Sequence, residues 1–228
     1  MTTVIVVCEG RTEAAFVEKL LQPPLAHGGI YMEPRLISTS SQARGGALDI
    51  QRVRRYLRNT LRERRDTCVT TFFDLYGLPA NFPGRSDAPS PGDPLNRARH
   101  IEAELHRQVV HDAGCRPERF VPHVQPHEFE ALLFSDVKAF ETAEPSWRQW
   151  TARLAEVRMR VRSPEHINDG PDTHPSARLR QLRPEYKKVA HGVAVSSRIG
   201  LHRIRAECRH FDRWLTRIEG LPALVSMA

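Results

Sequence analysis

Carboxylate side chains follow three of the four strands that the sequence predicts. Glu9 comes directly after the first strand, Asp74 follows the third, and Glu128 and Glu130 follow the fourth after a short turn. In an open parallel sheet the ligand site lies beyond the carboxyl ends of the strands. Carboxylates gathered at that edge repel one another unless a cation neutralises them, and hard oxygen ligands suit Mg²⁺ or Mn²⁺. The spacing therefore predicts a divalent metal site.

Two neighbours of Glu9 belong to the same predicted site. Gly10 allows close backbone approach to a substrate phosphate, and Glu13 lies one helical turn beyond Glu9 as a further metal ligand. Each acid also has an ordinary structural explanation: Glu9 and Glu13 favour the positive end of a helix, Asp74 suits a turn, and Glu128 suits a first helical turn. Their common position after strands favours the metal site.

Basic and histidine residues supply candidate substrate contacts. Arg178 and Lys188 lie in or just after a polar, turn-rich stretch, and we expect them to bind substrate phosphate or to balance the acids, the alternative being a polar surface loop. His127 stands beside Glu128 and is a candidate proton carrier or substrate contact. Zinc binding by His123 and His127 is disfavoured because Pro126 breaks any helix across them.

The composition indicates a folded protein with a polyanionic partner. The 228 residues are 40% hydrophobic and 27% charged, which excludes a disordered chain, and 34 basic against 27 acidic side chains leave a formal net charge of +7. No targeting or membrane-spanning segment is evident, and the four cysteines are too dispersed for a disulfide framework or a zinc ribbon. We therefore expect a cytoplasmic protein with no membrane contact.

Apolar runs that alternate with helical patterns predict an α/β fold. Strands separated by helices favour a mainly parallel sheet of about four strands, flanked by helices. The predicted strands are Thr3–Cys8, Pro34–Thr39, Cys68–Phe73 and Phe120–Val124. The predicted helices are Thr12–Leu21 (ended by Pro23 and Pro24), Ala47–Arg65, Leu95–Ala113, Glu128–Phe134, Trp147–Val161 and Leu201–Ile218.

The chain divides into two regions by pattern. Residues 1–140 carry the α/β pattern, and residues 141–228 are predicted to form a helical extension packed on that core. Within the extension, Ser163–Pro184 is polar and rich in turn residues. The amphipathic helix that ends at Ile218 could pack on its own sheet or on a second copy of the chain, so a homodimer stays open.

Several segments resemble one family of bacterial proteins. They are V-V-C-E-G-R-T-E (Val6 to Glu13), F-F-D-L-Y-G (Phe72 to Gly77) and H-V-Q-P-H-E-F-E-A-L-L-F-S-D (His123 to Asp136), with shorter matches as far as Phe211. The chain is similar in these segments to the DUF4276 family, a divergent branch of the TOPRIM superfamily that is related to OLD-type nucleases. The resemblance implies a TOPRIM-like Rossmannoid fold.

The resemblance also implies roles for individual residues. TOPRIM domains bind Mg²⁺ through a glutamate after the first strand and an acidic motif after the third, which correspond here to Glu9 and Asp74. The second acid of that D-x-D motif is replaced by Tyr76, so Glu128 or Glu130 must supply the missing ligand if two metals are used. Glu9 is then the candidate for proton transfer, and Asp74 and Glu128 complete the catalytic set.

These expectations together favour a metal-dependent nuclease or phosphodiesterase. The substrate would be DNA or RNA, and the resemblance implies an ABC- or SMC-like ATPase as partner in anti-phage defence. A non-catalytic nucleic-acid-binding or regulatory subunit with a degenerate site is the alternative, favoured by Tyr76. A small-nucleotide phosphoesterase is a third hypothesis.

Overall fold

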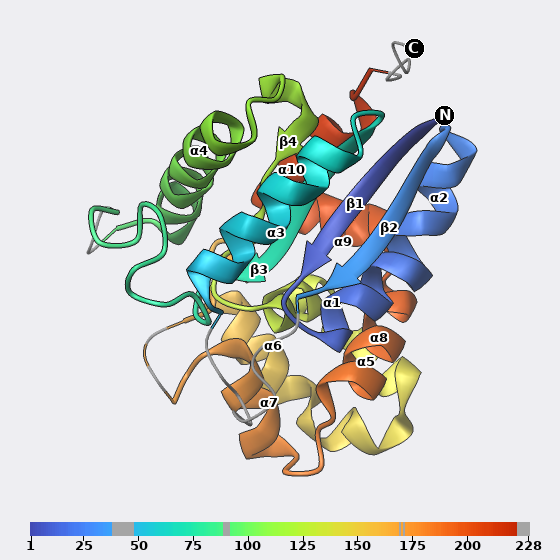
Figure 1. Cartoon of the computed structure of the whole chain (residues 1–228). Helices are drawn as coiled ribbons and strands as arrows, with labels where there is room; N and C mark the ends of the chain where they lie inside the picture. Colours follow the sequence, from blue (N-terminus) through green and yellow to red (C-terminus); the bar gives the residue numbers. More distant parts are fainter. Residues whose placement is uncertain (38–47, 89–91, 169, 171, 223–228) are drawn as a thin grey trace.

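Five parallel strands form the centre of the protein in a computed structural model that describes residues 1–37, 48–88, 92–168, 170 and 172–222. The strand order is β2-β1-β3-β4, and β5 pairs with β3 beyond the end of β4. This arrangement confirms the predicted α/β class with a mainly parallel sheet flanked by helices (Figure 1). The strands are β1 (Thr2–Cys8), β2 (Ile30–Leu36), β3 (Thr67–Asp74), β4 (Phe120–Val121) and β5 (Val124–Gln125).

Successive side chains of β1 point to opposite faces of the sheet and contribute to two hydrophobic cores, one on each face. Val4 and Val6 face one core, whereas Ile5 and Val7 face the other, because successive strand side chains point to opposite faces. All four side chains are buried. The continuous apolar sequence of the strand is therefore the consequence of its being covered on both sides.

Two long helices cover the face of the sheet that carries Ile5 and Val7. They are α3 (Ile50–Glu63), which crosses in front of the strands in Figure 1, and α4 (Pro94–Ala113), which is drawn to the left of β4. Each begins at an aspartate: Asp49 accepts hydrogen bonds from the backbone of Gln51 and Arg52, and Asp93 accepts one from Leu95. The predicted helix 47–65 is therefore shorter than expected, and residue 47 lies outside the described residues.

Helices from both ends of the chain cover the other face. Phe16, Phe72 and Phe211 share one core with Trp147 and Leu154, so the segments before and after residue 140 bury apolar surface together. The other α-helices of the described residues are α1 (Arg11–Phe16), α2 (Gln22–His27), α5 (Lys138–Ala143), α6 (Thr151–Met159), α7 (Pro175–Leu182), α8 (Lys188–Ile199), α9 (Leu201–Glu207) and α10 (Arg209–Glu219).

Prolines explain several differences from the predicted elements. The first helical segment does not stop at Pro23-Pro24 but continues through a π turn into α2, where both prolines lie in the first turn and their missing N–H groups cost little. The second strand begins at Ile30 rather than Pro34, and Pro34 is tolerated within it because β2 is an edge strand. The predicted end of that strand at residues 38–39 lies outside the described residues.

The remaining differences concern the second half of the chain. The predicted fourth strand is split into β4 and β5 around Pro122, which cannot donate to a sheet. The predicted helix Glu128–Phe134 is a 3-10 turn over Phe129–Ser135, and Pro145–Trp150 is a 3-10 turn that precedes α6. The stretch Ser163–Pro184 contains α7, α8 was not predicted, and the expected helix Leu201–Ile218 is broken at Cys208 into α9 and α10.

No helix among the described residues is long and apolar enough to cross a membrane.

A buried side-chain hydrogen bond fastens α10 to the sheet. Trp214 Nε1 donates to Thr70 Oγ1 on β3 at 2.8 Å, and the same hydroxyl donates to the Val121 carbonyl. Thr70→Val should lower the free energy of unfolding by about 1–3 kcal/mol, because it leaves the indole N–H unpaired. Urea denaturation measures this, with Thr3→Val on β1 as the matched control. Equal stability of the two variants would contradict the assignment.

Candidate functional site

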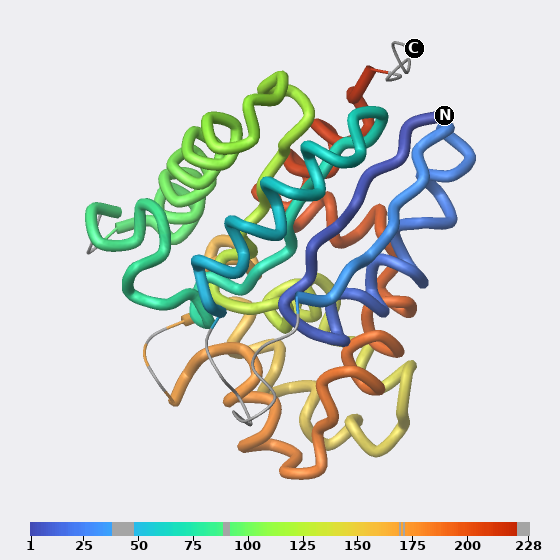
Figure 2. The backbone as a smooth tube through the Cα atoms, viewed as in Figure 1, coloured from blue at the N-terminus to red at the C-terminus, as the bar shows by residue number. Residues whose placement is uncertain are grey.

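Five carboxylates and one ammonium group meet beyond the carboxyl ends of β1 and β3; we call this group the acidic centre. The segment from β5 into the Phe129–Ser135 turn passes below these strand ends (Figure 2) and brings its own acids to them. The members of the acidic centre are Glu9, Glu13, Asp74, Glu128, Glu130 and Lys188.

Three of these carboxylates are close enough to share one ion. Oxygen atoms of Asp74, Glu128 and Glu130 all lie within 4.8 Å of one another. Asp74 Oδ1 accepts a hydrogen bond from the backbone of Phe129 at 2.8 Å, which fixes the end of β3 to the turn that carries Glu130. Glu9 and Glu13 adjoin this trio but are not part of it.

Glu9 is held at the end of β1 by backbone contacts of the β3 segment. Its Oε2 accepts a hydrogen bond from Asp74 N at 3.3 Å. Its other oxygen lies against Gly77, where a Cβ atom would come within 2.6 Å of Glu9 Oε1. The glycine of F-F-D-L-Y-G is therefore a packing requirement of the Glu9 carboxylate. Gly10 has the same relation to Glu13, whose Oε2 lies 2.9 Å from the position of a Cβ there.

Glu128 is oriented by the N-terminal end of α7. Its two oxygens accept hydrogen bonds from Ser176 N at 2.9 Å and Ser176 Oγ at 3.1 Å. His174 Nε2 lies 3.9 Å from Glu128 Oε1 and its ring stacks on Tyr76 at a centroid distance of 4.8 Å. Tyr76 thus packs beside the acidic centre through His174.

Lys188 is the basic member of the acidic centre and begins α8. Its Nζ lies 3.2 Å from Glu130 Oε2 and 3.5 Å from Glu128 Oε1. Burial by itself lowers the pKa of Lys188, but Glu130 and Glu128 together raise it above its ordinary value. The ammonium group therefore stays charged and balances part of the buried negative charge.

One positive charge does not compensate five acids, and the carboxyl pKa values reflect this. Burial, with a further contribution from Glu13, raises the pKa of Glu9 to about 7. Burial likewise raises the pKa of Glu130 to about 7, against the opposing effect of Lys188. Burial together with Glu13 and Glu9 raises the pKa of Asp74 well above its ordinary value. Raised pKa values favour proton binding by these carboxyls near neutral pH, and a bound divalent cation would compete with those protons.

The donor set of the acidic centre fits Mg²⁺ or Mn²⁺. All of its ligand atoms are carboxylate oxygens, which hard divalent ions prefer. Glu130 Oε1 is buried and has no hydrogen-bond partner among the described residues, so one oxygen is left for a cation. Asp74, Glu128 and Glu130 would hold the ion, with Glu9 adjoining them.

The predicted substrate residues His127 and Arg178 both contact the segment 168–178. His127 adopts a left-handed backbone with φ 62°, and its Nδ1 lies 3.0 Å from Asn168 Nδ2. Arg178, on α7, donates through Nε to the Thr173 carbonyl at 2.6 Å. Both therefore make contacts within the 168–178 segment, and their predicted roles in substrate binding stay predictions.

Sequence reasoning did not assign Ser176, His174 or Gly77 to the site. Ser176 and His174 come from T-H-P-S, an ordinary turn preceding a helix, and no local pattern ties that turn to Glu128. Gly77 had a detectable signal, because a glycine three residues after a strand-end acid is typical of a tight turn. Its contact with Glu9 depends on the register between β1 and β3.

Comparison with known proteins identifies one family. The model of a family described as "Domain of unknown function (DUF4276)" matches residues 8–219 and so spans all six members of the acidic centre. No curated protein and no solved structure matches the chain.

The raised carboxyl pKa values predict how stability depends on pH. A glutamate with a folded-state pKa near 7 and an unfolded value near 4.5 binds its proton more tightly when folded, so stability is lost as pH rises from about 4.5 through 7. Glu9→Gln keeps the neutral form at every pH. In EDTA, the unfolding free energy of the wild type should therefore fall relative to Glu9→Gln across this window, as measured by urea denaturation. A difference independent of pH would contradict the raised pKa.

The contact between Gly77 and Glu9 predicts a position-specific effect of one methyl group. Gly77→Ala should displace the Glu9 carboxylate, because the new Cβ would lie 2.6 Å from its Oε1. The variant should weaken Mn²⁺ binding by about tenfold, a loss of about 1.4 kcal/mol, as measured by calorimetry. Gly220→Ala, at the end of α10 where a Cβ meets its nearest atom at 3.5 Å, is the matched control. Equal Mn²⁺ affinity in both variants would contradict the claim that Gly77 is required to position the Glu9 carboxylate.

Proposed function

This chain belongs to the DUF4276 family, and we propose that it is a metal-dependent phosphodiester hydrolase that acts on nucleic acid. The observation that carries the proposal is the convergence of Asp74, Glu128 and Glu130, whose oxygens lie within 4.8 Å of one another. Placing like charges this close is costly without a cation. Lys188 supplies part of the compensation, and a divalent ion would supply the rest.

In this proposal the chain's own residues hold the ion and move the proton. Asp74, Glu128 and Glu130 are the ligands, and when bound the ion would act as a Lewis acid that neutralises charge on the phosphate. Glu9 accepts the proton of the attacking water, because its pKa of about 7 suits a general base at neutral pH. The Asp74 backbone N–H orients the Glu9 carboxylate for this role.

The charge distribution supports a nucleic-acid substrate. The net charge of +7 favours binding to a polyanion. Arg52 and Arg55 are exposed on α3, whose buried face packs on the sheet through Val53 and Leu57. Exposed arginines contact phosphates without reading sequence, so we expect salt-sensitive binding of little sequence preference.

The TOPRIM relationship and the partner ATPase belong to this proposal as well. A strand-end glutamate and aspartate on a parallel sheet are the elements that this relationship requires, and Glu9 and Asp74 occupy those places. In that setting the protein would be the nuclease component of a pair with an ABC- or SMC-like ATPase in defence against phage.

A non-catalytic nucleic-acid-binding subunit is the second candidate, and one contact favours it. Lys188 Nζ already lies against both Glu130 and Glu128, as a permanent cation would in a site that binds no metal. Tyr76, at the position where the TOPRIM resemblance implies a second acid, also favours a non-catalytic subunit. Metal dependence separates the two functions.

The experiment compares cleavage by matched pairs of variants. Glu9→Gln combined with Asp74→Asn should reduce Mg²⁺- or Mn²⁺-dependent cleavage of fluorescent DNA and RNA oligonucleotides by at least about a hundredfold, because it removes the base and a ligand. Glu118→Gln combined with Asp66→Asn removes two exposed acids elsewhere and should leave cleavage unchanged. Melting curves verify that both proteins are folded.

The outcomes distinguish the candidates. Cleavage that survives in the Glu9 and Asp74 double variant overturns the hydrolase proposal. Oligonucleotide binding without cleavage, equal in Mg²⁺ and in EDTA, supports the binding subunit. Turnover of mononucleotides alone would assign the site to a small-nucleotide phosphoesterase.

A further inference from the structure

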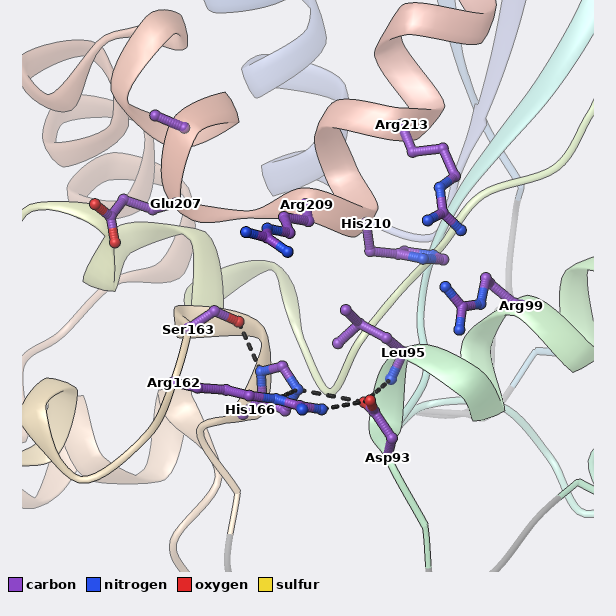
Figure 3. Close-up of a pocket in the computed structure, with 11 residues that line it drawn as sticks. Asp93, Leu95, Arg99, Arg162, Ser163, His166, Glu207, Arg209, His210 and Arg213 are labelled. Atoms are coloured by element: carbon purple, nitrogen blue, oxygen red, sulfur yellow. Dashed lines mark hydrogen bonds and ion pairs between the residues drawn. The ribbon is translucent and has the colours of Figure 1, made fainter.

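A second concave site lies away from the acidic centre and is lined mainly by basic side chains. It is a pocket of about 480 Å³ between the start of α4, the segment 162–166 and the junction of α9 and α10 (Figure 3). Four arginines line it, and we call it the arginine pocket. They are Arg99, Arg162, Arg209 and Arg213.

Two of these arginines form no ion pair with any acid of the described residues. Arg209 and Arg213 have no hydrogen bond or ion pair with the residues that the structure describes, and both are exposed one turn apart on α10. Among the residues that the structure describes, the one hydrogen-bond partner of the Arg99 guanidinium is Asn96 on its own helix. Figure 3 shows Arg99 and Arg213 on either side of His210. Guanidinium groups that pair with no acid of the described residues therefore line one pocket from two helices, α4 and α10.

The acids of the arginine pocket do not cancel this charge. Asp93 accepts from Leu95 N at 3.0 Å as the cap of α4 and pairs with Arg162. Glu207 forms ion pairs with two arginines that do not line the pocket. Its Oε2 lies 2.6 Å from Arg158 Nη2, and its Oε1 lies 3.2 Å from Arg203 Nη2. The pocket lining holds four arginines and two acids, Asp93 and Glu207, which leaves an excess of two positive charges. Because Glu207 pairs with arginines outside the pocket, it neutralises little of the charge inside it.

His210 adds a basic group at the pocket wall. It is 3% exposed, and its Nε2 lies 2.8 Å from Glu102 Oε1, so that nitrogen donates to the carboxylate. Burial lowers the pKa of His210, but Glu102 raises it above its ordinary value overall. The His210 backbone N–H is satisfied by Glu165 at 3.0 Å, which fixes the ring at the start of α10.

We propose that the arginine pocket binds the phosphate group of a nucleotide unit. One planar guanidinium group can donate two parallel hydrogen bonds to phosphate oxygens. Here four arginines from three parts of the chain line one cavity: α4, the segment 162–166 and α10. The cavity volume is that of sites for molecules of nucleotide size. Binding here requires no metal and no hydrolysis, so the proposal stands independently of the reaction proposed for the acidic centre.

The phosphate could belong to a free nucleotide or to a nucleic-acid strand, and the test has one arm for each. Calorimetry in EDTA measures binding of AMP and of a ten-residue oligothymidylate to the wild type. The same titrations are repeated with two variants. One is the double variant Arg209→Gln with Arg213→Gln, and the other is the single variant Arg217→Gln. Arg217 is an exposed residue of the same helix that does not line the pocket, and it provides the matched control.

The double variant should lose about tenfold or more in affinity for the ligand that uses the pocket, because each lost contact is a hydrogen bond to a charged group. Arg217→Gln should bind as the wild type does. A loss for AMP alone identifies a free nucleotide, and a loss for the oligothymidylate with a shallower salt dependence identifies a strand. The proposal is overturned if the wild type binds neither ligand, or if the double variant and Arg217→Gln bind equally.

Discussion

The burial of like charges at one end of a parallel sheet is the constraint that shapes this protein. Five carboxylates come together there, and Lys188 contacts two of them, Glu128 and Glu130, directly. Hydrogen bonds from Asp74 N, Phe129 N and Ser176 reduce the cost of this arrangement without removing it. The uncompensated negative charge raises the pKa values of the Glu9 and Glu130 carboxyls, and it is the reason for proposing a divalent ion at the acidic centre.

The α/β core alone does not complete the acidic centre. Glu9 and Asp74 come from neighbouring strands, Glu128 and Glu130 from the turn after β5, and Lys188 from α8. Trp147 and Phe211 bury their rings in the core that also holds β1, so the later helices are part of the same packing unit. Removing them would expose a hydrophobic face and leave the carboxylates without their ammonium group.

The sequence was sufficient for whatever depends on local pattern. The buried strands β1 and β3 were predicted to within one residue, and topology then placed Glu9 and Asp74 at the same edge. Boundaries shaped by prolines were missed, because the cost of a proline depends on whether its strand lies at an edge or its helix is just beginning. The partners of Glu128 were missed for another reason: Ser176 is 48 residues away, and only the docking of α7 brings it close. The arginine pocket is likewise a product of tertiary packing.

The separation of Lys188 from its partners has a consequence for how the chain reaches its native state. Lys188 lies 58 residues beyond Glu130, whereas the acids of β1 and β3 are juxtaposed as soon as those strands pair. All five acids therefore come before Lys188 in the chain, and they lack its ammonium group until α8 has packed against them. Closing this long loop is an entropic step that local contacts do not assist. The cation that allows the acidic centre to exist is thus the last of its members to be synthesised, and emergence of α8 from the ribosome sets the earliest time at which the centre can close.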